Sequence, residues 1–472
     1  MNYFPKYFLN KSLLLYFLVL TAVTFLYFRY AMDIVWFLFG IVEVVGFFYF
    51  SNSLTKKWSA ITTKHFIRNI FYTALIIRVV WVVFSYFFCM NMTGQPFEFG
   101  AADVHFYDNI AKYGSQLIAS GNFNFYEEFN KYSGGLAFSD LGYPVYLSFV
   151  YFLTDNSILI ARLLKAVWAA WACVLVYKFA VRNFGEPTAR IAAVFCMLMP
   201  NLIYYCGLHL KETEMVFLTV AAVERTDNLI RANKYVFKNL YMPILLVALL
   251  FMFRTVLGAA VLFAFITTLF FSSSRVLKLS NRIIITAWVI LALAFFMGGN
   301  IANEVEDVWA RRTTNQKSTL EWRAESKGGN PYARYASSAV FAPAIFIIPI
   351  PTMVNIEGQE NQQLLHGGNF VKEIMAFFLI LAFLVIIDTG KWRDFTLPGV
   401  YLLSYLLVIA FSAFAQSERF HLPIIPFFLM FAAYGVTNLT KPAKNYFMWY
   451  MIIIFAVIIA WNWFKLSGRG LI

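Results

Sequence analysis

The sequence predicts an all-helical protein that crosses a membrane many times, and three observations support this fold class. Of the 472 residues, 61% are hydrophobic and only 13% are charged, and the mean hydropathy is +0.66. Soluble domains are about half apolar and one quarter charged, so a soluble globular protein is excluded. Aromatic residues make up 19% of the chain, which is typical of lipid-facing helices and of the aromatic belts at membrane interfaces.

The apolar runs have the length of helical spans. A helix needs about 20 apolar residues to cross a bilayer core roughly 30 Å thick, and these runs lack the alternation of lipid-facing β-strands. The first run follows two lysines without a signal-peptidase site, so we expect it to remain as an uncleaved span. We expect about thirteen transmembrane helices, near residues 12–29, 33–50, 69–89, 157–180, 189–206, 213–224, 239–253, 256–272, 282–298, 369–387, 395–414, 422–438 and 446–464.

Basic residues predict the orientation, because Lys and Arg collect in cytoplasmic loops. The formal charge of +13 therefore indicates cytoplasmic loops and contact with membrane lipids, and we expect no nucleic-acid partner. If thirteen spans begin inside, the tail with Lys465 and Arg469 lies outside, against the rule, but the other basic clusters share the inner side. Those clusters are Lys56, Lys57, Lys64 and Arg68; Arg182 and Arg190; Arg225, Arg231, Lys234 and Lys238; Arg275, Lys278 and Arg282; Lys391 and Arg393; Lys441 and Lys444.

Two long polar segments, 90–156 and 299–368, then lie on the outer side. Loops of this length in a compact fold are usually functional. In the first we expect a helix from Asp103 to Ser120, ended by a Gly-Asn pair. The stretch Tyr143–Leu153 is too short to cross the bilayer, so we expect an interfacial helix on the outer leaflet. In the second, residues 336–350 form another partly embedded segment.

The runs 239–253 and 256–272 are joined at Arg254-Thr255 with almost no turn. We interpret them as two short spans that bend at an outer-side arginine. One long kinked helix is the alternative.

Charged residues near membrane depth are costly, and for this reason they are candidates for function. Each also has a simpler explanation: a helix cap for Asp103, a solvated turn for the glutamates, snorkelling for Arg254, or interface anchoring. One carboxylate with several cations on the outer surface is what a reaction between an anionic lipid-linked donor and a neutral hydroxyl acceptor requires. The candidates are Asp103, Lys211, Glu212, Glu214, Arg254, Glu418, Arg419 and His421.

Several stretches, in their order from residue 69 to 440, resemble the GT-C superfamily of membrane glycosyltransferases. The likeness is greatest to glycosyltransferase family 39, the group of the protein O-mannosyltransferases and the aminoarabinose transferase of lipid A. The stretches are ADVHFYD (102–108), GYPVYL (142–147), ARLLKAV (161–167), VRNFGEPTAR (181–190), MPNLIYYC (199–206), KETE (211–214), LLFMFRTVLGAA (249–260) and ERFHLPIIPF (418–427). The resemblance implies a GT-C-like catalytic module over 69–440, after a two-span extension (1–68) and before a last span and tail (441–472).

The resemblance also implies a function. A polyprenyl-phosphate-sugar donor would enter an outer-face cavity, and its sugar would pass with inversion to a hydroxyl acceptor on a glycolipid, glycan or protein. Asp103 would be the general base, and the donor phosphate or sugar would contact Lys211, Arg254, Arg419, His421 and Arg162. Arg162 would also order the carboxylate. The expected location is a bacterial inner membrane, with the active site on the periplasmic or extracellular face.

The sequence departs from the family at two places. A single Asp103 stands where an Asp-Glu pair often occurs, and Lys211-Glu212 replaces the acidic pair of the oligosaccharyltransferase branch. Dependence on a divalent metal ion therefore stays open, with Glu212 and Glu214 as the candidate ligands. The four cysteines have no spacing that indicates a zinc site or a disulfide framework.

Two other functions stay open. An O-antigen polymerase or ligase also transfers glycans on the outer face, and arginines in the 299–368 loop suit that alternative: Arg311, Arg312, Arg323 and Arg334. A non-enzymatic lipid-linked glycan flippase or other transporter is the second alternative. Transporters usually show paired halves with charges near the bilayer midplane, whereas this sequence shows no repeat and has its charges near one face.

Overall fold

The computed structural model describes residues 2–100, 102–231, 237–271, 338–412 and 414–472, with Ser318, Glu321, Ala324, Glu325 and Asn330. Within these residues the regular elements are all α-helices or 3-10 helices, so the predicted all-helical class is confirmed. The predicted span 282–298 and most of residues 299–337 of the predicted 299–368 loop lie outside the described residues.

Eight helical segments in the described part of the chain are long and apolar enough to cross a membrane. The number rises to ten if each of two bent helix pairs counts as one span. The larger figure of about thirteen stays a prediction. The eight are α1 (Lys6–Leu26), α2 (Ile34–Trp58), α3 (Thr63–Thr93), α7 (Ile158–Phe184), α16 (His366–Asp388), the segment Lys391–Ala410 with α17 (Thr396–Ala410), the segment Glu418–Thr437 with α19 (Ile425–Thr437), and α20 (Ala443–Ser467).

The predicted run 189–206 forms two helices. α8 (Glu186–Leu198) and α9 (Pro200–Cys206) meet at an angle of 46°. The break falls at Met199, whose backbone is extended, because the residue before a proline is disfavoured in the α conformation.

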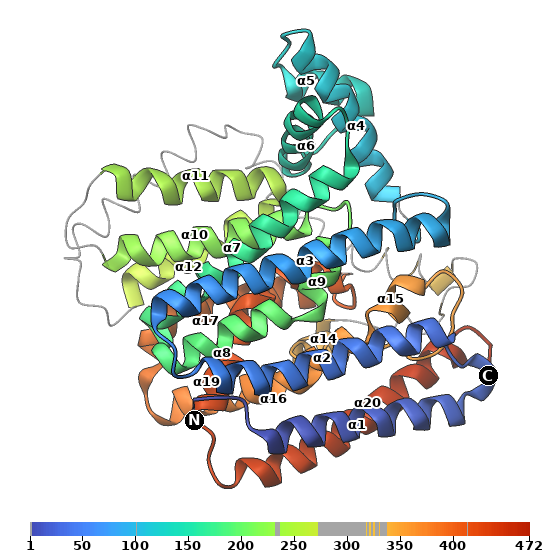
Figure 1. Ribbon diagram of the computed structural model, residues 1–472, viewed down its shortest axis with the longest axis vertical. Coiled ribbons are helices and arrows are strands. Elements are labelled where there is room, and N and C mark those ends of the chain that lie inside the picture. Colours follow the sequence, from blue (N-terminus) through green and yellow to red (C-terminus); the bar gives the residue numbers. More distant parts are fainter. Residues whose placement is uncertain are drawn as a thin grey trace.

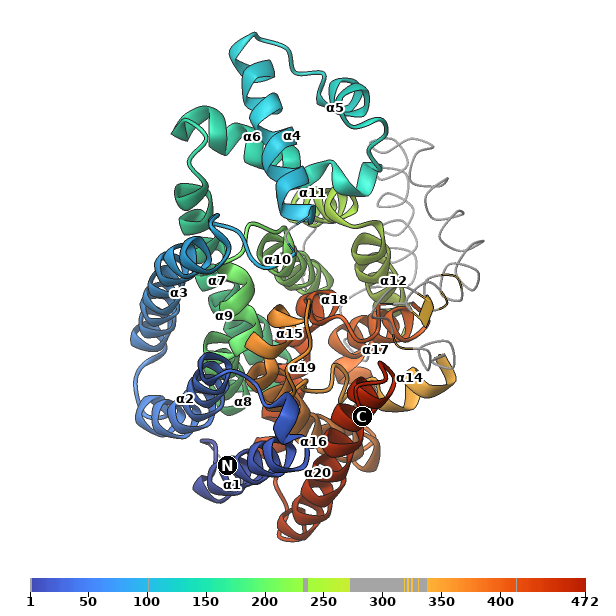
Figure 2. The same cartoon turned by 90° about the vertical axis from the view of Figure 1, so that its right-hand side faces the viewer.

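α10 (Glu212–Arg231), α11 (Phe237–Phe253) and α12 (Thr255–Phe271) follow. The latter two are separate helices linked by one residue, and Figure 2 shows them side by side. An added methyl group on Gly258 of α12 would lie 2.5 Å from the ring of Phe251 on α11, so only glycine permits this close approach. Residues 239–271 therefore form two helices that meet at Arg254 and not one long kinked helix, and their interpretation as two short spans stays a prediction.

Most of the long helices run alongside one another, so their connections gather at two opposite ends (Figure 1). At one end, Arg190 donates to the carbonyl oxygens of Trp58 at 2.7 Å and Ile61 at 2.8 Å. Arg182 forms an ion pair with Asp227 at 2.7 Å near the same end. We call this the basic end, because the predicted inner-side clusters around residues 56–68 and 182–190 lie there.

The opposite end carries the segment 102–154, and we call it the cap end. This segment contains α4 (Ala102–Ala119), α5 (Phe125–Ser133), the 3-10 helix η2 (Phe138–Asp140) and α6 (Gly142–Thr154), which project together from the bundle (Figure 1). α4 and α6 match the helices predicted at 103–120 and 143–153. They pack so closely that an added methyl on Gly114 would overlap the hydroxyl of Ser148.

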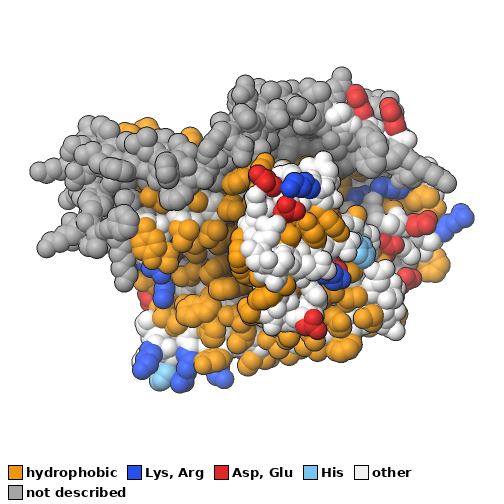
Figure 3. Space-filling model, turned by 90° about the horizontal axis from the view of Figure 1, so that it is seen from above, with side chains coloured by type: hydrophobic (Ala, Val, Ile, Leu, Met, Phe, Trp, Pro, Cys, Tyr) orange, Lys and Arg blue, Asp and Glu red, His pale blue; other side chains and the backbone are white. Residues whose placement is uncertain are grey.

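The distribution of side chains on the surface is consistent with a basic end and a cap end. In Figure 3 apolar side chains cover much of the described face between the two ends, and Lys and Arg side chains gather at the left edge, the basic end. Acidic and basic side chains occur together towards the right, the cap end. An apolar middle between two polar ends is the pattern that a bilayer requires.

The first and last described helices are neighbours, since α1 and α20 lie side by side in both ribbon views (Figures 1 and 2). The rings of Phe8 and Phe447 are 5.0 Å apart between centroids. At the cap end, the hydroxyl of Tyr30 donates to the carbonyl oxygen of Leu471 at 2.6 Å.

Candidate functional site

Three side chains that are distant in the sequence meet at the cap end. Arg419 Nη1 donates to Asp103 Oδ2 at 2.7 Å, and Arg419 Nε lies 3.1 Å from Glu212 Oε1. The Asp103 side chain is 54% exposed, that of Arg419 is 26% exposed, and that of Glu212 is fully buried. The guanidinium therefore bridges a carboxylate at the surface and a carboxylate in the interior.

Local structure explains why the two carboxylates lie here. Asp103 is in the first turn of α4 and Glu212 is in the first turn of α10. Carboxylates are favoured at helix N-termini, where unpaired backbone N–H groups create a partial positive charge. Arg419 belongs to the single-turn helix α18 (Glu418–His421), which leads directly into Pro423 of the 3-10 helix η5 (Leu422–Ile424).

Lys211 forms a second ion pair beside this group. Its ammonium donates to Asp140 of η2 and, at 2.8 Å, to the carbonyl oxygen of Phe253. The Tyr107 hydroxyl donates to the same aspartate at 3.4 Å. Burial lowers the pKa of Lys211, and the charge of Asp140 acts in the opposite direction. Lys211 thus ties α10 to η2 and to the end of α11.

Arg254, at the junction of α11 and α12, reaches the same group through an aromatic ring. Its guanidinium lies 4.4 Å from the centroid of the Phe420 ring, and that of Arg419 lies 5.5 Å from it. Cations are attracted to aromatic faces, more so where water is excluded. Nη1 of Arg254 is buried and has no hydrogen-bond partner among the described residues, so it can donate to an incoming anion.

Two of the predicted donor contacts lie apart from this group. His421 is buried, with Nε2 2.8 Å from the carbonyl oxygen of Ala415 and Nδ1 3.1 Å from Lys372 Nζ. Arg162 on α7 is also buried, and its Nη2 donates to the carbonyl oxygen of Pro96 at 2.5 Å. The carboxylate of Asp103 is ordered by Arg419 and not by Arg162.

The candidate metal ligands face cations. Glu212 lies against Arg419, and Glu214 lies 3.6 Å from Lys165 Nζ. In the part of the chain that the structure describes, no group of three or more His, Cys, Asp or Glu side chains is arranged to hold a metal ion. The negative charge of each glutamate is compensated by a basic side chain.

Sequence reasoning did not single out Asp140, Phe420 or Lys165, which all contact predicted residues. Asp140 lies two residues before the stretch 142–147, and Phe420 lies between the predicted residues Arg419 and His421. Closeness in sequence to predicted residues could therefore have indicated both. Lys165 follows Arg162 by three residues, which places both on one face of α7. Its ammonium donates to the carbonyl oxygen of Leu208 at 2.8 Å and so holds the loop before α10.

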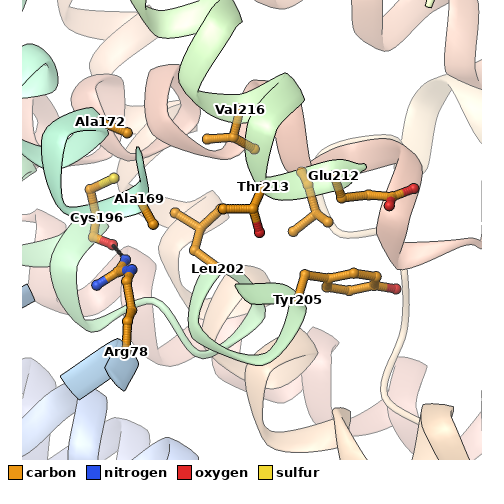
Figure 4. A pocket seen from close by; sticks show the side chains of 10 residues that line it. Arg78, Ala169, Ala172, Cys196, Leu202, Tyr205, Glu212, Thr213 and Val216 are labelled. Carbon is orange, nitrogen blue, oxygen red and sulfur yellow. Dashed lines mark hydrogen bonds between the residues drawn. The ribbon is translucent and has the colours of Figure 1, made fainter. Parts of the chain in front are cut away.

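A small cavity of about 10 Å³ lies behind Glu212, room for about one water molecule. Figure 4 shows Glu212 at one side of it and Arg78 of α3 at the other. Arg78 donates to the carbonyl oxygens of Cys196 and Met197 at 3.3 and 3.2 Å. These bonds fix the C-terminal end of α8, where the break before α9 leaves carbonyl groups without helical partners.

Comparisons with family models, with curated proteins and with solved structures found no match. Fold and site together define a class: an all-helical protein with membrane-spanning helices and a cluster of paired carboxylates and cations at one end.

Proposed function

We propose that this protein is an integral membrane glycosyltransferase of the GT-C type. It moves a sugar from a polyprenyl-phosphate donor to a hydroxyl acceptor, with inversion. The observation that carries the proposal is the position of Arg419 between Asp103 and Glu212, with Arg254 across the ring of Phe420. It combines a candidate base with two phosphate-binding groups.

The cations fit the donor's leaving group. Guanidinium groups bind phosphate oxygens through paired, charge-assisted hydrogen bonds. Arg254 offers a buried N–H without a described partner, and Arg419 presents a partly exposed guanidinium. A phosphate whose negative charge is held in this way leaves readily, so a strong general acid, such as a glycosidase uses, is not required.

Asp103 fits the base. In the transfer step the acceptor oxygen bonds to the anomeric carbon, the bond from that carbon to the phosphate oxygen breaks, and the hydroxyl proton moves to Asp103. Attack from the side opposite the phosphate inverts the carbon. The donor phosphate competes with Asp103 for Arg419, since both are anions, so donor binding releases the carboxylate for proton transfer.

The proposal includes the orientation. The cap end faces the periplasm or the outside, the basic end faces the cytoplasm, and the protein lies in a bacterial inner membrane with about thirteen spans. The basic clusters around residues 56–68 and 182–190 come from distant parts of the sequence and meet at one end of the bundle, and such clusters face the cytoplasm, which supports this arrangement. A glycan polymerase or ligase would have the same orientation, but the arginines that suit it lie outside the described residues.

A transporter of lipid-linked glycans is the second candidate, because one observation favours it. Lys372 and Glu373 are ionisable residues buried within the spanning helix α16, and both carboxylate oxygens of Glu373 have no hydrogen-bond partner among the described residues. Such residues often mark transport pathways. Ionisable residues therefore occur inside the spanning helices as well as at the cap end, whereas the sequence analysis expects the charges near one face.

The test is Asp103→Asn in purified protein reconstituted in lipid vesicles, with a panel of radiolabelled undecaprenyl-phosphate-linked sugars as donors and an envelope glycolipid extract as acceptor. Asparagine retains the size of the side chain and its capacity to cap a helix but not its basicity. Transfer should fall by about 10²–10⁴-fold, the usual contribution of a general base, with an unchanged melting temperature. A pure transporter would move labelled lipid across the vesicle membrane without forming a new glycoside.

The control substitution is Glu127→Gln on α5, an exposed carboxylate of the same segment, which should retain transfer activity. Asp108, five residues after Asp103 on α4, is unsuitable as a control. It is buried, accepts a hydrogen bond from the Tyr151 hydroxyl at 2.5 Å and pairs with Lys112 at 2.7 Å. Full activity of a folded Asp103→Asn protein would contradict the mechanism.

A further inference from the structure

A second pocket, of about 330 Å³, lies where α3 leads into α4. Small-molecule sites typically occupy roughly 300–1,000 Å³, so its size suits a small ligand. The side chains that line it include Thr93, Gln95, Phe97, Glu98, Phe99 and His105.

Glu98 indicates which kind of ligand this pocket would bind. The residue is 8% exposed, and its Oε2 is buried with no hydrogen-bond partner in the described ranges. Burial raises the pKa of Glu98, and the nearby charges of Arg162 and Lys165 partly offset that effect. A buried acceptor without a donor is unfavourable, and a ligand that donates a hydrogen bond would relieve the cost.

The surroundings favour an uncharged ligand. Arg162 and Lys165 already provide positive charge that acts on the Glu98 carboxylate, so a cationic ligand is not required there and an uncharged hydroxyl group can supply the missing hydrogen bond. Phe97 and Phe99 provide apolar faces, and the His105 ring lies 4.9 Å from that of Phe97 between centroids. A neutral imidazole both donates and accepts hydrogen bonds. Apolar faces with a few hydrogen-bonding groups suit a carbohydrate ring, which is apolar on its faces and carries hydroxyls at its rim.

The pocket adjoins the proposed catalytic group. Glu98 in the pocket is close enough to Glu212 of that group for the charge of one to act on the other. We infer that this pocket binds an uncharged carbohydrate, the hydroxyl-bearing acceptor of the transfer reaction. The assignment of this carbohydrate as the acceptor rests on the proposed function. The binding of a carbohydrate in the pocket does not.

The experiment measures binding without turnover. Protein in lipid nanodiscs is titrated with the methyl glycosides of glucose, mannose and galactose and, separately, with choline as a cationic probe, using saturation-transfer NMR. Glu98→Leu removes the acceptor, and Gln95→Trp fills the pocket from an exposed position that does not burden folding. Glu357→Leu, at an exposed glutamate of the same end, is the matched control.

At least one glycoside should bind to the wild-type protein and to Glu357→Leu, and its affinity should fall about tenfold or more in both pocket variants, as expected for a hydrogen bond to a charged group. The inference is overturned if no glycoside binds, if both pocket variants bind as the wild type does, or if choline binds in preference.

Kinetics separate this inference from the proposed function. In the transfer assay Gln95→Trp should raise the acceptor KM about tenfold and leave the donor KM unchanged. Glycoside binding that depends on Glu98, in a protein without transfer activity, would overturn the proposed function alone. Normal acceptor KM in both pocket variants of an active enzyme would overturn the pocket alone.

Discussion

Arg419 contacts two carboxylates that differ in their exposure to solvent. Glu212 is fully buried, so its charge depends on the cation 3.1 Å away, whereas the carboxylate of Asp103 is largely hydrated. Removing one partner of a buried ion pair is costly because the other charge remains in a medium of low polarity. Loss of Arg419 therefore affects folding and ligand binding, and an experiment must separate the two.

Arg254→Ala and Arg419→Ala should each raise the donor KM by about 10–100-fold, the range expected for a charge-assisted hydrogen bond. Arg419→Ala should also lower the free energy of unfolding by on the order of 3 kcal/mol, because Glu212 loses its cation. The double variant Arg419→Ala/Glu212→Gln should recover most of that stability without recovering donor binding. Unchanged donor KM in both single variants would assign these arginines to lipid headgroups.

Glu98 should contribute to a pH dependence of stability. Its pKa is raised above the ordinary 4.5 by burial, with Arg162 and Lys165 acting in the opposite direction and Glu212 in the same direction. The folded state thus binds the proton more tightly than the unfolded state. The stabilisation is complete below about pH 4.5 and is lost as the pH rises through the raised pKa.

Melting temperatures measured from pH 4 to 8 test this expectation. Glu98→Gln should flatten the decline above pH 4.5, whereas Glu357→Gln should follow the wild type. A wild-type protein whose stability rises steadily over this range, with the same slope in Glu98→Gln, would contradict the assigned environment of Glu98.

The individual elements could largely be predicted from the sequence, but their partners could not. The helices 103–120 and 143–153 were recognisable because apolar periodicity and stop signals are local properties, and α4 and α6 match them. The pairing of Lys211 with Asp140 was not predictable, since periodicity reports which face of a helix is apolar and not which element covers it.

The orientation of site residues in very short helices could not be predicted from the sequence. α18 is a single turn of four residues, so Arg419 and His421 sit close together in sequence but face different surroundings. Arg419 points towards α4 and α10, and His421 points inwards to Lys372. Direction within one turn depends on tertiary packing, and no local pattern encodes it.

The contact between α16 and α19 gives a test at this scale. A methyl group on Gly435 of α19 would lie 2.0 Å from the carbonyl oxygen of Phe378, a backbone atom that cannot rotate away. Gly435→Ala should therefore destabilise the protein by about 1–3 kcal/mol, the usual cost of overpacking.

The matched control is Gly46→Ala on α2, where an added methyl meets no atom within 4 Å. It should not reduce stability, because alanine is the better helix former. Thermal unfolding in nanodiscs gives both values, and equal melting temperatures for the two variants would contradict the tight α16–α19 contact.

For the whole molecule, the two ends predict a labelling pattern. The four native cysteines are buried, so background reaction with an impermeant maleimide should be low. On intact spheroplasts, Glu127→Cys at the cap end should react, whereas Lys57→Cys at the basic end should react only after permeabilisation. The reverse pattern would contradict the proposed orientation, and with it the outer-face location of the site.

The contact between α1 and α20 has a consequence for biogenesis. A ribosome adds roughly 5–20 residues per second, so the interval between completing Leu26 and beginning Ala443 is on the order of a minute. Throughout that interval the ring of Phe8 can pack only against helices made earlier, among them α16 through Phe378 at 5.2 Å between centroids, because Phe447 does not yet exist. A chain that stalls before residue 443 would therefore lack the α1–α20 contact alone, and the surface of α1 that α20 covers would stay open to lipid or to an insertion factor.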